Sequence, residues 1–75
     1  MADTILPKAS VDRIIRKAGA ERVGDKASAA LAVALEEIGL DISRIARELS
    51  EHANRKTVTD KDVRLAYSQW KRART

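Results

Sequence analysis

The long helix-forming stretch in the middle of the chain is the feature that most restricts the fold. Residues 25–52 contain no proline and are rich in alanine, leucine and glutamate, which favour helix. At about 1.5 Å per residue, a helix over this range spans roughly 42 Å, which exceeds the diameter of a compact domain of this chain length. Such a helix cannot be wrapped by two short segments of its own chain.

An apolar stripe runs along this predicted helix. Its residues recur every three or four positions, nearly as a heptad, which places them on one face. They are Leu31, Leu35, Ile38, Ile42 and Ile45. We expect a second copy of the chain to cross the helix and cover this stripe, which makes these five residues the predicted dimer core.

The composition excludes other ways of stabilising so small a domain. The chain has 75 residues, no cysteine and one histidine, which excludes disulfides and leaves a zinc site short of ligands. Three glycines and one proline among many helix formers predict an all-α fold. No apolar run reaches the roughly 20 residues of a membrane span, and no signal-peptide pattern is present. We expect no metal, cofactor or membrane, and a cytoplasmic protein that associates with itself.

Two shorter helices are predicted on either side of the long one. The first begins with Ser10 as its N-cap and ends near Gly19, and the last begins with a capping box at Thr59 to Asp62. Tight connections at residues 20–23 and 55–58 are called the first strap and the second strap below, and Asn54 is expected to end the long helix. Residues 1–7 are predicted to be a short arm and residues 8–75 one domain.

Charge is segregated along the chain. The net charge is +4, with five basic and two acidic residues over 8–22, three and six over 23–54, and seven and two over 55–75. Basic ends around an acidic middle favour a polyanionic partner, and duplex DNA is the one we expect.

Taken together, these residues closely resemble the archaeal histones. The similarity runs from about Leu6 to Lys71. The matching segments are Arg13-Ile14-Ile15, Ala18-Gly19-Ala20-Glu21-Arg22-Val23, Leu35-Glu36-Glu37, His52-Ala53, Arg55-Lys56-Thr57 and Asp62-Val63. The resemblance implies a histone fold, a handshake homodimer, and sequence-independent wrapping of double-stranded DNA on the chromosome. A paralogous histone is an alternative mate.

The resemblance also implies DNA-binding residues. Arg22 matches the strap arginine that enters the minor groove, where a guanidinium suits the negative potential. Lys56 and Thr57 match a phosphate-contacting pair in the second strap, and Arg13 and Arg16 match basic positions on the DNA side of the first helix.

Protein contacts follow from the same resemblance. Arg55 and Asp62 match an ion pair that braces the second strap, and Leu49, His52 and Asp62 match a contact between dimers. The chain differs from the family at positions linked to stacking of dimers, namely Lys17, Val33, Glu51, Arg64 and Ser68. We therefore expect tetramers on DNA more than continuous stacks.

Other classes of function are less consistent with the sequence. Catalysis has no support, since there is no glycine-rich phosphate loop, no cysteine and no second histidine, and no small-molecule substrate is expected. A histone-fold interaction module that binds another protein is the main alternative, but both straps are basic. A coiled-coil protein would continue its heptads through residues 53–59, and this chain does not.

Overall fold

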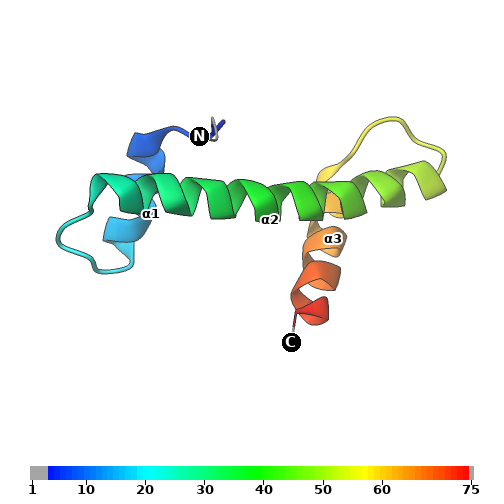
Figure 1. Ribbon diagram of the computed structural model, residues 1–75. Helices are drawn as coiled ribbons and strands as arrows, with labels where there is room; N and C mark the ends of the chain where they lie inside the picture. Colours follow the sequence, from blue (N-terminus) through cyan, green and yellow to red (C-terminus); the bar gives the residue numbers. More distant parts are fainter. Residues whose placement is uncertain (1–3, 75) are drawn as a thin grey trace. The chain divides into compact units, whose positions relative to one another are not determined.

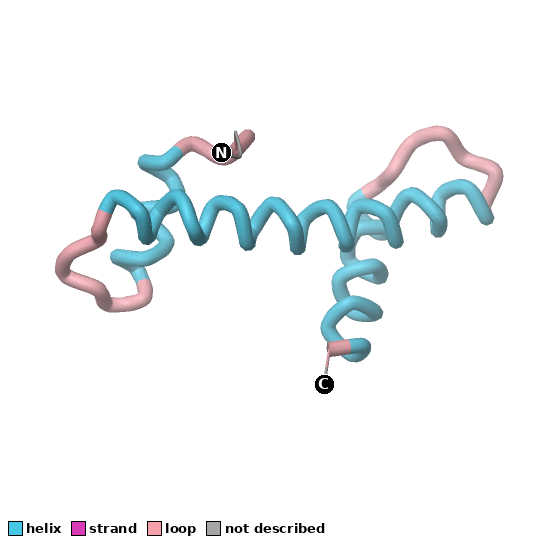
Figure 2. The backbone as a smooth tube through the Cα atoms, viewed as in Figure 1, coloured by secondary structure: helices cyan, strands magenta, loops and turns pink. Residues whose placement is uncertain are grey.

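The computed structural model describes residues 4–74 and contains three helices over that range, with no strand. Helix α1 covers Lys8–Lys17, α2 covers Asp25–His52 and α3 covers Asp60–Ala73 (Figures 1 and 2). The predicted order of short, long and short helix is confirmed, and α2 has the predicted bounds. The chain divides into two units between Glu37 and Ile38, and each is described by itself.

In the first unit, α1 packs against the first part of α2. Val11 of α1 and Ala32 of α2 are buried, and the buried Ser28 hydroxyl donates a hydrogen bond to the Asp12 carboxylate. The prediction of Ser10 as N-cap is wrong, because α1 begins two residues earlier after Pro7, whose fixed φ suits a helix start. Asp12 is therefore not in the first turn, and its side chain serves the contact with α2 instead.

The segment before α1 is also attached to α2. The Leu6 backbone N–H donates to Glu36 Oε2 at 2.9 Å, and Lys8 Nζ lies 3.2 Å from Asp25 Oδ1 at the start of α2. Within residues 4–7, which belong to the predicted arm, the structure thus records a link to the long helix.

In the second unit, α3 packs against the last part of α2. Ala46 and Ser50 of α2 and Ala66 of α3 are buried. The Ser50 hydroxyl donates to the Arg47 carbonyl at 2.9 Å, which satisfies this polar group inside its own helix.

The buried positions of α2 share a property: all are small. Ser28 and Ala32 face α1, Ala46 and Ser50 face α3, and each pair is spaced by four residues. Small side chains let the short helices approach the α2 backbone closely. These four positions lie about 60–100° around the helix from Leu31, beside the predicted dimer core and not on it.

The larger apolar residues of α2 consequently remain uncovered. All five predicted dimer-core residues keep partial solvent exposure, and the buried apolar residues among those described are Val11, Ala32, Ala46 and Ala66. A core of one valine and three alanines removes too little apolar surface from water to stabilise a domain of this size. The arrangement supports a partner chain over the Leu/Ile stripe.

Two leucines of α2 test this prediction. Leu35 is in the stripe, whereas Leu40 is 54% exposed and lies on the opposite side of the helix. Leu35→Ala should lower the free energy of unfolding of the dimer by about 2–5 kcal/mol, and Leu40→Ala by well under about 1 kcal/mol. Urea unfolding at several protein concentrations measures both, and the midpoint should rise with concentration. Equal losses for the two variants, or a midpoint independent of concentration, would contradict the dimer core.

Candidate nucleic-acid interface

The first strap follows a helix end that glycine makes possible. Gly19 has φ +113°, a conformation that other residues rarely adopt, and its N–H donates to the Arg16 carbonyl at 2.9 Å. The chain therefore leaves α1 sharply after Ala18 and enters the strap at residue 20. Arg22 is exposed there, and Val23 is partly buried beside it.

An arginine of α1 also holds the first strap. Arg16 Nη1 donates to the Glu21 carbonyl at 3.0 Å, so this guanidinium is bonded to the residue that precedes Arg22. Arg16 is a predicted DNA-binding residue, and its remaining N–H groups are still available for that role. Arg13 is exposed on the same helix.

The second strap begins at a helix end closed by backbone bonds. Asn54 has φ +59°, as expected for a residue that ends a helix, and its N–H donates to the Glu51 carbonyl at 2.9 Å. The Arg55 N–H donates to the Ser50 carbonyl at 2.9 Å, which completes a Schellman motif with asparagine in the usual glycine position. Lys56 and Thr57 follow and are exposed.

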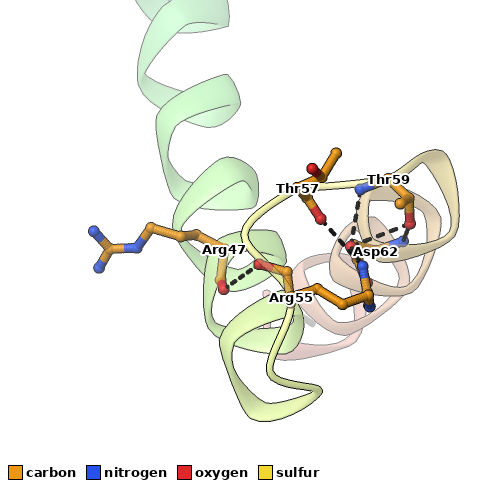
Figure 3. A network of polar contacts seen from close by, with 6 residues as sticks. Arg47, Arg55, Thr57, Thr59 and Asp62 are labelled. Carbon is orange, nitrogen blue, oxygen red and sulfur yellow. Dashed lines mark hydrogen bonds and ion pairs between the residues drawn. The ribbon is translucent and has the colours of Figure 1, made fainter.

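Arg55 and Asp62 meet across the second strap (Figure 3). Arg55 Nη2 and Nη1 lie 2.8 and 2.9 Å from the two carboxylate oxygens of Asp62, and Nη1 also donates to the Thr57 carbonyl at 3.1 Å. One guanidinium thus ties the strap to the first turn of α3. Bidentate pairs of this kind fix geometry as well as charge.

The predicted capping box of α3 is present at the same carboxylate. The Thr59 backbone N–H donates to Asp62 Oδ2 at 2.9 Å, and the Asp62 N–H donates to the Thr59 hydroxyl. Asp62 is therefore both the brace of the strap and the cap of the helix. Only 7% of its side chain is exposed, against 40% for Arg55.

The residues predicted to join two dimers lie in the second unit. Leu49 is partly exposed and His52 is exposed at the end of α2, while Asp62 is buried. Asp62 Oδ2 accepts bonds from Arg55 and Thr59, whereas Oδ1 accepts a bond from Arg55. Because a carboxylate oxygen accepts two hydrogen bonds, Oδ1 retains capacity for a further donor.

Metal sites and membrane spans are absent from the described part of the chain. Residues 4–74 contain no cluster of histidine and acidic side chains that is able to hold a metal ion. Among the same residues, no helix combines the length and apolar character needed to span a bilayer.

Comparison with known proteins decides the family. The family model described as histone-like transcription factor (CBF/NF-Y) and archaeal histone matches residues 4–67. The chain belongs to this histone-fold family. The predicted all-α histone fold is thereby confirmed, and α3 continues beyond the matched residues to Ala73.

Curated relatives of this histone-fold chain give the same result. The archaeal histone HAN1 from Thermococcus zilligii is 56% identical over 61 residues, which cover 81% of this chain and 91% of that protein. Probable archaeal histone 3 from Methanocaldococcus jannaschii is 51% identical over 61 residues, with the same coverage.

Sequence reasoning missed several of the contacts that position the straps of this histone-fold chain. The Ser28–Asp12 bond, the Arg16–Glu21 bond and the Lys8–Asp25 pair join residues 5 to 17 positions apart. Serine and alanine at four-residue spacing on α2 was the available signal for the helix contacts, but alanines at neighbouring positions of α2 are exposed. Spacing alone did not separate the two sets.

The Asp62 network predicts a specific pH dependence. The Arg55 guanidinium and the Thr59 backbone N–H hold the pKa of Asp62 well below its usual range. A lowered folded-state pKa stabilises the histone fold fully above the unfolded pKa near 4, and this contribution is lost as the pH falls below it. Between about pH 4 and pH 2, the wild type should therefore lose stability more steeply than Asp62→Asn.

Thermal unfolding followed over this pH range measures the effect. Asp60→Asn is the matched control, because Asp60 is in the same helical turn but 74% exposed, and pairs with Arg64 on the surface. Its pH profile should follow the wild type. Identical profiles for Asp62→Asn and the wild type would contradict the bracing role.

Proposed function

We propose that two copies of the chain form a handshake dimer, in which the α2 helices cross, and that the straps of both copies hold the backbone of duplex DNA and bend it. Archaeal histones bind and compact DNA, and this member of the family is a structural protein of the chromosome and not an enzyme. We assign the grip on DNA to residues of the two straps and of α1.

The exposed cations on braced straps are the observation that supports it. Arg22 and Lys56 are exposed, and each strap has an arginine that donates to one of its carbonyls, Arg16 in the first and Arg55 in the second. A braced loop loses little conformational entropy when a phosphate binds to it. Arg22 is proposed to enter the minor groove, as arginines do where the groove faces the protein.

The remaining contacts of the proposed interface are to phosphates. Thr57 offers a hydroxyl beside Lys56, and Arg13 and Arg16 present guanidinium groups from α1. None of these contacts reads a base edge, so the preference among sequences comes from how readily each duplex bends. Binding is consequently largely independent of sequence.

Assembly beyond the dimer is proposed at the end of α2. Leu49 supplies apolar surface, and His52 supplies a donor for the Oδ1 of Asp62 in a second dimer. A second copy of the chain is the proposed mate, and a paralogous histone with the same Leu/Ile stripe is the alternative mate.

Salt dependence tests the strap contacts. Each phosphate contact that a substitution removes should lower the slope of log K against log salt by about 0.9, so Lys56→Ala should lower it by about 2 per dimer. Arg22→Ala should weaken binding to random-sequence DNA in the same way. Arg44→Ala is the control, since Arg44 is exposed on α2 and paired with Asp41 at 3.5 Å.

Electrophoretic mobility shift over a series of salt concentrations gives these slopes. A wild-type chain that fails to bind random-sequence duplex would favour the interaction module that binds another protein. Slopes that fall equally for Lys56→Ala and Arg44→Ala would show that net charge alone matters, against the proposed straps.

Removal of the histidine side chain tests the contact between dimers. His52→Ala should shift the assembled state on DNA from tetramer to dimer, because the donor to Asp62 is removed while the dimer core is unchanged. Sedimentation of the DNA complexes measures the shift, and Asp41→Ala on exposed α2 surface is the control. Unchanged sedimentation of the His52→Ala complex would refute this contact.

A further inference from the structure

We propose that the last turn of α3 is an additional DNA-binding surface, in which Lys71 and Arg74 hold phosphates of the same duplex. This basic end is separate from both straps. The inference rests on the proposed function, since it adds a contact to a duplex already held by the dimer.

The charge of this segment is the first observation. Residues 63–74 contain four cationic side chains and no acidic one, and Lys71, Arg72 and Arg74 are exposed together near the end of α3. The nearest acidic side chains in sequence, Asp60 and Asp62, are bonded to Arg64 and Arg55. A cluster of cations with no acidic side chain among them attracts a polyanion.

The partners of the two cations are the second observation. Lys71 Nζ lies 5.5 Å from the centre of the Tyr67 ring, and the Arg74 guanidinium lies 5.0 Å from the centre of the Trp70 ring. The two rings are themselves stacked, with centres 6.2 Å apart. A ring holds a cation in place by its quadrupole but carries no net charge.

Other cations of the chain are held differently. Lys8, Arg44, Arg47 and Arg64 each lie against a carboxylate of a neighbouring residue or helix turn. Those charges are balanced within the protein. Lys71 and Arg74 are instead positioned by neutral rings, so their full charge and their outward N–H groups remain available to an anion.

The shape of the duplex backbone fits this arrangement. Lys71 and Arg74 are three residues apart and therefore on neighbouring turns of one helix face, a spacing that places both heads on the same side of α3. Duplex DNA presents a continuous row of phosphates, so one strand can meet two cations on one helix face at the same time. The stacked rings keep the heads on that face before DNA binds.

A purely helical role gives a different expectation. Cations in the last turn of a helix stabilise it through the helix dipole, whether or not DNA is present. On that account, removing them would weaken α3 slightly and leave the salt dependence of DNA binding unchanged. DNA contact and dipole stabilisation are thus separable by experiment.

The test is the double variant Lys71→Gln/Arg74→Gln in the full chain. Removing two phosphate contacts from each chain should lower the salt slope for a random-sequence duplex by about 3–4 per dimer. The matched control is Arg44→Gln/Arg47→Gln, which removes the same number of charges from carboxylate-paired positions of α2 and should leave the slope near the wild-type value. The exchange Lys71→Arg/Arg74→Lys keeps both charges and should also retain the wild-type slope.

Circular dichroism and sedimentation without DNA verify that each variant remains a folded dimer. A double variant that folds and keeps the wild-type slope would overturn the inference, and so would a charge-retaining exchange whose slope falls as far as that of the double variant. If Lys56→Ala still lowers the slope in either case, the proposed strap function stands and only the additional surface fails.

Discussion

Coverage of the long helix is the constraint on which the rest of the structure depends. Helix α2 uses its small residues, Ser28 and Ala32 toward α1 and Ala46 and Ser50 toward α3, for packing within the chain. Because those side chains are small, they leave the larger leucines and isoleucines partly exposed on the adjacent face. Close approach of the short helices and exposure of the stripe are therefore two results of one pattern. The chain's own packing prepares a surface that a second chain has to cover.

The straps depend on this packing for their position. Each is a few residues long, follows a left-handed residue, and is held by an arginine bonded to a strap carbonyl. In the second strap the same arginine also binds Asp62, so helix cap, strap and ion pair share one carboxylate. The exposed cations beside these braces therefore extend from restricted backbone. In this way the chain presents ordered charge to a polyanion.

Much of this was predictable from particular residues. The bounds of α2, the left-handed Asn54 and the capping box at Thr59 follow from local rules, because caps and helix stops act over a few residues. The prediction of Ser10 as a cap is wrong, since Pro7 starts the helix earlier without a side-chain cap. The pairing of Tyr67 with Lys71 and of Trp70 with Arg74 has the four-residue spacing at which such pairs meet on a helix.

The sequence by itself determined the helices, the segregation of charge, the apolar stripe and the family, because each depends on periodicity, on local capping or on the order of residues along the chain. Only the tertiary structure decided which alanines and serines of α2 are buried, that Asp12 serves Ser28, and that Arg16 is bonded to the first strap. Those outcomes depend on the angle at which one helix meets another. Several positions of α2 carry equally small side chains, so the pattern along the chain does not specify which of them lie under α1 and α3.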